Sequence, residues 1–195
     1  MTEIIHSASG IVHGTPEWHT ARSNGVTGTD IGAILGVNQY KSRMDVFMAK
    51  TVGVPPFQDN EYAKWGRLLE PVVAQEWARL HNLEIEQGTF ISKDWMLGSP
   101  DYLVKNSKHG VEVKTAGYSQ LKSYKDGKCP LSYEYQCRWY MAVMDYEKWS
   151  LPALVGGQKL FEFDFYRDER IEKMMIETGK EFWDQVLEWR AKNPR

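Results

Sequence analysis

The sequence predicts an α/β domain in which helices flank a mixed central β-sheet. Helix-type and strand-type patterns follow one another in the order helices, strands, helix, strands, helix, as expected when helices pack against a sheet. The chain has 195 residues, of which 42% are hydrophobic and 26% charged, enough for one domain with a substantial core. No repeat, low-complexity segment or long linker divides it, so we expect residues 1–195 to form a single domain.

Two short helices are expected first. Thr29, which is followed by an aspartate, can cap a helix that ends at Gly36. Ser42 and Asp45 have the spacing of a second helix start, and Gly53 is a suitable end for that helix.

A longer helix is expected from Asp59 or Asn60 to His81. Its apolar stripe repeats at helical spacing and consists of Tyr62, Trp65, Leu69, Val72, Val73, Trp77 and Leu80. Pro71 interrupts this pattern because proline lacks the backbone N–H that a helix interior requires. We therefore expect Glu70 to lie at a kink or at the junction of two helices.

The rest of the chain alternates between strands and helices. Short strands separated by turn residues are expected from Leu83 to Thr115, followed by a helix over Leu131–Met144. Two further strands are expected around Trp149–Leu154 and Lys159–Tyr166, and the second alternates three phenylalanines with polar residues. A final amphipathic helix covers Asp168–Lys192.

Three charged residues in the strand region suggest a site. Asp101 begins one short apolar run, and Glu112 and Lys114 lie in the next. Because side chains alternate along a strand, Glu112 and Lys114 would share one face, and Val111 and Val113 the other. If the two runs form a hairpin, Asp101 lies beside Glu112.

Two carboxylates beside an ammonium suit phosphodiester hydrolysis. Mg²⁺ or Mn²⁺ prefers oxygen ligands, neutralises phosphate charge and lowers the pKa of a bound water. Taken alone, the three residues fit an ordinary turn and a solvated strand face better than a catalytic site.

Charge and cysteine content limit the classes of function. The net charge is −2, without the overall basic character of many DNA-binding proteins. Six lysines nevertheless fall in one segment that could form a basic patch, namely Lys105, Lys108, Lys114, Lys122, Lys125 and Lys128, whereas acidic residues concentrate from Glu162 to Glu188. Cys129 and Cys137 are too few for a zinc pattern, a disulfide framework or an iron–sulfur cluster. With no signal peptide and no apolar run as long as a membrane span, a cytoplasmic protein is expected.

Five blocks in order resemble the phage lambda exonuclease family, the YqaJ-type viral recombinase domain of the PD-(D/E)xK nucleases. They are Trp18–Arg22 with Val26–Gly36, Tyr40–Ser42, Trp65–Pro71, Ser99–Asp101 with Glu112–Lys114, and Tyr135–Tyr140. The resemblance covers about Trp18 to Trp149 and implies a restriction-endonuclease-like core. The sequence departs from the family pattern at Tyr102, where glycine is common, and at Thr29, where serine is common.

The resemblance implies a role for each matching residue. The implied metal ligands are the carboxylates of Glu70, Asp101 and Glu112 and the carbonyl of Val113. Lys114 would be the catalytic lysine, and Gln136 would orient the water or the scissile phosphate. Arg22 and Thr29 would hold a phosphate, which we expect to be the terminal 5′ phosphate.

The activity implied by the resemblance is that of a Mg²⁺-dependent exonuclease, with two ions per site and Mn²⁺ as a substitute. It would degrade double-stranded DNA from 5′ ends and leave 3′ single strands for phage-type recombination. The implied partners are a single-strand annealing protein and two further copies of the chain in a trimeric ring, in the cytoplasm of a bacterial or phage-infected cell. The alternatives are a different PD-(D/E)xK endonuclease and a non-catalytic DNA-end-binding module.

Overall fold

The computed structural model describes residues 6–7, 11, 14–53 and 60–194. The helices are α1 (Pro16–Ser23), α2 (Gly28–Ile34), α3 (Arg43–Thr51), α4 (Glu61–His81), α5 (Leu121–Lys125), α6 (Leu131–Met144) and α7 (Glu169–Lys192), with a 3-10 turn at Tyr118–Gln120. The strands are β1 (His6–Ser7), β2 (Val26–Thr27), β3 (Ile85–Gln87), β4 (Ile91–Lys93), β5 (Met96–Gly98), β6 (Tyr102–Val104), β7 (His109–Val111), β8 (Lys114–Ala116), β9 (Lys148–Val155) and β10 (Lys159–Tyr166).

The central sheet is mixed, as the sequence predicts. Its strand order is β10-β9-β7-β6-β3, and β8 also pairs with β9. The β6–β7 and β9–β10 pairs are antiparallel, whereas β7 and β8 run parallel to successive halves of β9. Two consecutive strands, β7 and β8, thus pair with the same strand, β9. They are separated by a short interruption at Glu112 and Val113. A smaller sheet of order β1-β4-β5-β2 lies beside it.

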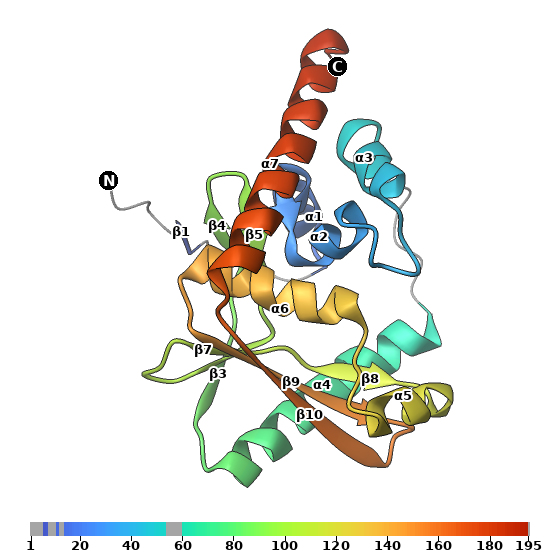
Figure 1. Ribbon diagram of the computed structural model, residues 1–195, viewed down its shortest axis with the longest axis vertical. Helices are drawn as coiled ribbons and strands as arrows, with labels where there is room; N and C mark the ends of the chain where they lie inside the picture. The colour runs from blue at the N-terminus through green and yellow to red at the C-terminus, as the bar shows by residue number, and fades with distance from the viewer. Residues whose placement is uncertain (1–5, 8–10, 12–13, 54–59, 195) are drawn as a thin grey trace.

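Helices cover the central sheet through two separate hydrophobic cores (Figure 1). The larger core joins α2, α6 and α7 to β9, and its fully buried side chains include Trp139, Trp149 and Phe182. The smaller core packs Val73 and Trp77 of α4 against β6 and β7. Gly110 makes one close approach possible, because a Cβ at this position would lie 2.3 Å from the Trp149 ring. These two cores confirm the predicted α/β class with helices flanking a mixed sheet.

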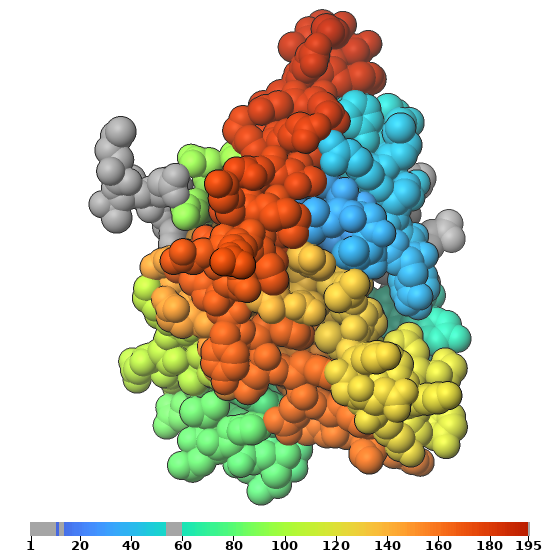
Figure 2. Space-filling model, viewed as in Figure 1, coloured from blue at the N-terminus to red at the C-terminus, as the bar shows by residue number. Residues whose placement is uncertain are grey.

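Several element boundaries agree with the sequence prediction. The bounds of α6 and β10 are those expected, and α7 begins one residue after its cap, Asp168. Ser42 caps α3 through Asp45 N–H, as its spacing predicts. In Figure 2 the last turns of α7 extend beyond the body of the molecule.

Two expectations about the N-terminal helices need correction, and a third is confirmed. The cap of α2 is Thr27 rather than Thr29, because the backbone N–H and hydroxyl of Thr27 both donate to Asp30. A junction of two helices at Pro71 is wrong, since α4 is continuous from Glu61 to His81. Asn60 caps α4, and the other candidate, Asp59, lies outside the described residues.

The expected apolar stripe of α4 is buried only in part. Val73 and Trp77 are in the core, but four members of the stripe are exposed, namely Tyr62, Trp65, Val72 and Leu80. The face that α4 turns to the sheet is completed by two alanines, Ala74 and Ala78, which belong to the smaller core, and the helix approaches β8 and β9 closely. Among the described residues no helix has both the length and the apolar character that crossing a membrane requires.

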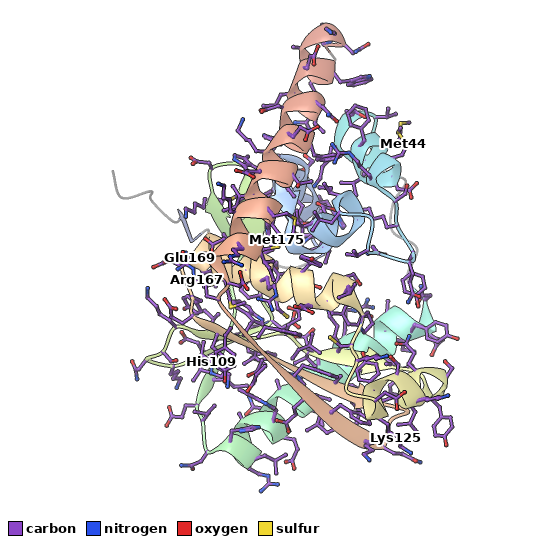
Figure 3. The ribbon with its side chains drawn as sticks, viewed as in Figure 1. Met44, His109, Lys125, Arg167, Glu169 and Met175 are labelled. Carbon is purple, nitrogen blue, oxygen red and sulfur yellow. The ribbon has the colours of Figure 1, made fainter. Side chains whose placement is uncertain are left out.

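His109, on β7, should make stability depend on pH (Figure 3). Its Nε2 lies 2.8 Å from the hydroxyl of Ser150 on β9, and its ring contacts the edge of Trp77. Burial and the nearby Lys148 ammonium lower the pKa of His109 from 6.5 to about 4. As pH falls from 6.5 toward 4, the unfolded chain therefore takes up a proton that the folded chain does not, and the free energy of unfolding decreases.

We expect His109→Gln, which can keep a hydrogen bond to Ser150, to remove this part of the pH dependence. The measurement is urea unfolding of both proteins at about pH 7 and about pH 5, within the window of the shifted titration. The wild type should lose more unfolding free energy between the two conditions than the variant. Equal losses would contradict the assignment to His109.

Candidate active site

A cavity of about 500 Å³ collects the residues that the sequence singles out. All eight predicted site residues line it: Arg22, Thr29, Glu70, Asp101, Glu112, Val113, Lys114 and Gln136. They come from α1, α2, α4, α6, the residue before β6, the β7–β8 interruption and the first residue of β8. The structure therefore brings together every predicted position, although the segments are far apart in sequence.

The predicted hairpin forms and places Asp101 next to the β7–β8 interruption. Tyr102 on β6 is opposite Val111 on β7, so Asp101 and Glu112 are at the same open end of the antiparallel pair. The backbone N–H of Val113 donates to Asp101 Oδ2 at 2.8 Å. Val111 and Val113 are both buried in the smaller core, which leaves Glu112 and Lys114 to face the cavity as predicted.

Glu112 is the best-held carboxylate of the site. It is 2% exposed, and its Oε1 accepts hydrogen bonds from Lys114 Nζ and Gln136 Nε2, both at 2.6 Å. Gln136 Nε2 also lies 3.0 Å from Tyr140 Oη, and the Tyr140 hydroxyl donates to the carbonyl of Ser99 at 3.3 Å. The other carboxylate oxygen, Oε2, is buried and has no hydrogen-bond partner among the described residues.

The pKa values of two carboxyl groups in the site, Asp101 and Glu70, are raised. Burial, followed by the charge of Glu112, raises the pKa of Asp101 well above its usual range and also raises the pKa of Glu70. For Lys114, burial lowers the pKa, but the neighbouring carboxylates of Glu112 and Asp101 outweigh it and the net direction is upward. Lys114 is therefore an ammonium at neutral pH, held by Glu112 and lying 4.9 Å from the centre of the Tyr133 ring.

The donor set fits a hard divalent cation. No group of three or more His, Cys, Asp or Glu side chains in the described part of the chain is arranged to hold a metal ion by itself. Mg²⁺ does not need such a cage, because it keeps several waters and is usually bound by one or two carboxylates together with substrate phosphates. The unpartnered Oε2 of Glu112 and the crowded, partly buried Asp101 carboxylate are the groups that a cation would stabilise.

A second cluster consists of Arg22 and two threonines, and two of its members, Arg22 and Thr29, line the cavity. Arg22 Nη2 donates to Thr29 Oγ1 at 2.6 Å and to Thr27 Oγ1 at 3.2 Å. The guanidinium lies over the Trp18 ring, 4.3 Å from its centre. Arginine in such a fixed orientation is suited to a two-pronged contact with phosphate.

Gly28 allows this cluster to approach the carboxylates. A Cβ at this position would lie 2.6 Å from the Tyr140 ring and 3.2 Å from the Gln136 side chain. Only glycine therefore lets the start of α2 lie directly against α6, which brings Thr29 into the same cavity as Gln136.

Some residues of the site were not predicted. Trp18 and Tyr140 were part of the family blocks, but sequence reasoning gave them no role. Each is four residues from a predicted site residue on the same helix, Arg22 and Gln136 respectively, so helical spacing was the available signal. The cavity is also lined by Arg67 of α4, three residues before Glu70, and by Gln87 at the end of β3.

The six lysines of the predicted basic patch do not share one location relative to the cavity. Lys114 is the one member of the six lysines that lines the cavity. Lys105 and Lys108 are near the turn of the β6–β7 hairpin, at the end away from Asp101, where they pair with Glu84 and Asp145.

A family model and a sequence relative identify the same family. A family model described as the YqaJ-like viral recombinase domain matches residues 17–147. The uncharacterized protein YqaJ of Bacillus subtilis (strain 168) is 31% identical over 179 residues, which is 88% of this chain and 56% of that protein. The chain thus spans a little over half the length of this relative.

Solved structures share the fold. The alkaline exonuclease LHK-Exo from Laribacter hongkongensis superposes with a TM-score of 0.77 at 17% identity, covering 91% of this chain and 95% of the other. The structure of LHK-Exo in complex with dAMP gives a TM-score of 0.75 at 18% identity with the same coverage. A phage-related exonuclease from Haemophilus somnus 129PT gives a TM-score of 0.62 at 14% identity, over 88% of this chain and 98% of that one. These matches identify the fold as that of alkaline exonucleases.

We expect Asp101→Asn to stabilise the metal-free protein at neutral pH. The pKa of Asp101 is raised by folding, so stability from this group is present at low pH and is lost as pH rises through the folded-state pKa. Asparagine removes the charge beside Glu112, and its side-chain oxygen can still accept the Val113 N–H. A gain of about 1 kcal/mol would raise Tm by about 2–4 °C in a domain of this size.

The measurement is thermal unfolding of wild type and Asp101→Asn in EDTA and in Mg²⁺. The variant should melt higher in EDTA and should lose the rise in Tm that Mg²⁺ gives the wild type. A lower Tm in EDTA, or an undiminished response to Mg²⁺, would contradict this description of the site.

Proposed function

The chain belongs to the YqaJ-like viral recombinase domain family, and on this premise we propose that it is a Mg²⁺-dependent exonuclease. It would degrade linear double-stranded DNA from 5′ ends and leave 3′ single strands for phage-type recombination. The observation that carries the proposal is that one cavity is lined both by Asp101, Glu112 and Lys114 and by the Arg22 and Thr29 pair. The first group is suited to phosphodiester hydrolysis and the second to holding a phosphate.

The metal would be held by the carboxylates of Glu70, Asp101 and Glu112 and by the carbonyl of Val113. Mg²⁺, or Mn²⁺ in its place, would neutralise phosphate charge and lower the pKa of a bound water, and two ions per site are proposed. The unpartnered Oε2 of Glu112 supports this ligand set from within the chain. Glu70 contributes a third negative charge that acts on both Asp101 and Glu112.

Lys114 and Gln136 would act on the reacting groups. The Lys114 ammonium is in a buried setting, where a positive charge stabilises the extra negative charge of a phosphoryl transition state more than it would in water. The amide of Gln136 is held between Glu112 and Tyr140, so it would orient a water or a phosphate oxygen from a fixed position.

Arg22 and Thr29 would hold the terminal 5′ phosphate. The guanidinium is already oriented by Trp18 and the two threonine hydroxyls, so little side-chain entropy would be lost on binding. That LHK-Exo was solved in complex with dAMP supports a nucleotide-sized ligand for this fold.

The proposal includes a trimeric ring and a single-strand annealing protein as partners. A ring can encircle DNA when its lining is basic, even if the net charge of each chain is −2. Exposed apolar side chains along α4 are consistent with a surface that binds another protein, and they are Tyr62, Trp65, Leu68 and Val72.

The proposed activity is tested with end-labelled linear duplex and covalently closed circular DNA in Mg²⁺. We expect the wild type to degrade the linear DNA from its 5′ ends and to spare the circle. Lys114→Ala should lose hydrolysis but still bind DNA in Ca²⁺, because the ammonium acts mainly on the transition state. Cleavage of the circle would favour an endonuclease, and Mg²⁺-independent DNA binding without cleavage would favour a non-catalytic end-binding module.

End recognition is tested by comparing 5′-phosphorylated with 5′-hydroxyl ends. We expect the wild type to prefer the phosphorylated end and Arg22→Ala to remove most of that preference. Loss of one charge-assisted contact costs about 1.5–3 kcal/mol, or roughly ten- to a hundredfold in the ratio of initial rates. Salt must be constant because general DNA binding depends on it. If Arg22→Ala slows both substrates equally, Arg22 does not read the 5′ end.

A further inference from the structure

Asp30, behind the Arg22 cluster, is the centre of a buried group of charges. It is 2% exposed, and its two carboxylate oxygens lie 2.9 Å from Lys41 Nζ and 2.8 Å from Lys50 Nζ. Lys50 is itself only 7% exposed, whereas Lys41 is partly open to solvent. None of the three lines the cavity of the candidate active site.

This buried group contacts Arg22 at two places. Lys50 Nζ donates to the backbone carbonyl of Arg22 at 2.6 Å. The Thr27 hydroxyl donates a hydrogen bond to Asp30 Oδ2 at 2.7 Å and accepts one from Arg22 Nη2 at 3.2 Å. The backbone of Arg22 is thus tied to Lys50, and its side chain is tied to Asp30 through one hydroxyl.

The backbone of Lys50 is in turn held by a residue of the C-terminal helix. Arg190, in the last turn of α7, donates to the carbonyl of Lys50 at 2.7 Å and to the carbonyl of Ser23 at 2.9 Å. The C-terminal helix therefore joins the end of α1, where Arg22 lies, to the end of α3, where Lys50 lies.

A buried ion pair is an unfavourable way to stabilise a fold. Burying an ion pair loses hydration free energy that the pair often fails to recover, and apolar residues of similar volume are frequently as stable. Burial alone would raise the pKa of Asp30, but Lys50, Lys41 and Arg22 together lower it well below its usual range. Asp30 is therefore ionised at neutral pH and accepts hydrogen bonds from Thr27.

We propose that the buried Asp30–Lys50 ion pair is a positioning device that holds Arg22 in place to receive the terminal 5′ phosphate. The inference rests on the proposed function, because it takes Arg22 as the residue that reads the DNA end. Asp30, Lys50 and Thr27 are positioning residues in this account, since they act on the substrate only through Arg22.

The test is a double-mutant cycle read out as the ratio of initial rates on 5′-phosphorylated and 5′-hydroxyl ends. Asp30→Asn removes the charge of the positioning device, and Arg22→Ala removes the residue on which it acts. Asp30→Asn should lower the ratio roughly five- to tenfold in the wild-type background, a range typical of coupled neighbouring residues, and should have no further effect in the Arg22→Ala background.

Two more variants separate positioning from loss of structure. Thr27→Val keeps the volume of the side chain and removes only the hydroxyl that links Asp30 to Arg22, so it should lower the ratio in the same direction. It decides the question if Asp30→Asn does not fold. Asp164→Asn breaks a comparable contact set away from the cavity, to Lys148 and Ser150, and should leave the ratio unchanged even if it lowers Tm.

The outcomes distinguish the inference from the proposed function. If the wild type prefers phosphorylated ends, Arg22→Ala removes the preference, and both Asp30→Asn and Thr27→Val keep the wild-type ratio, the positioning role is wrong and end reading by Arg22 stands. The positioning role is also wrong if Asp30→Asn lowers the ratio equally with and without Arg22, or if Asp164→Asn lowers it as much. If the wild type shows no preference, end reading itself fails and the positioning role fails with it.

Discussion

The buried carboxylate of Glu112 must be neutralised and hydrogen-bonded, and much of the surrounding structure follows from that requirement. A buried carboxylate without partners would cost several kcal/mol. Lys114 and Gln136 meet the requirement on one oxygen only. Lys114 can do so because the strand is interrupted after β7, and Gln136 because α6 packs across β9. The second oxygen, left without a partner among the described residues, is the chemical reason to expect a cation.

The cores on the two faces of the sheet make this concentration of charge possible. Asp101 and Glu70 both have raised pKa values because they are partly buried near Glu112. Their repulsion reduces stability in the metal-free chain, and apolar packing has to offset it. The smaller core holds Val111 and Val113 on either side of Glu112, and the larger core holds the helix that carries Gln136. The charged positions therefore have little freedom to move apart.

Close helix packing joins the two groups of residues that line the cavity. α2 lies against α6 at Gly28, which brings the Arg22 cluster to the carboxylates. On its other side the cluster is tied through Asp30 and Lys50 to α3, and through Arg190 to α7. Hydrogen bonds that join segments more than a hundred residues apart thus meet around one residue, Arg22. A site built in this way depends on the whole fold rather than on one loop.

The sequence by itself determined the fold class, most of the helices and strands, and the positions of the candidate site. Local patterns gave the bounds of α6 and β10, and ordered motifs gave eight residues that all line the cavity. It missed α1, although Thr15 and Pro16 are a good helix start, and it misjudged α4, where tertiary packing tolerates Pro71. Only the tertiary structure decided which partners meet: Gln136 with Glu112, Thr27 with Arg22 and Asp30, and Lys105 with Glu84 rather than the site. Local patterns set backbone conformation, whereas hydrogen bonds and ion pairs between distant segments depend on the packing of helices and sheet.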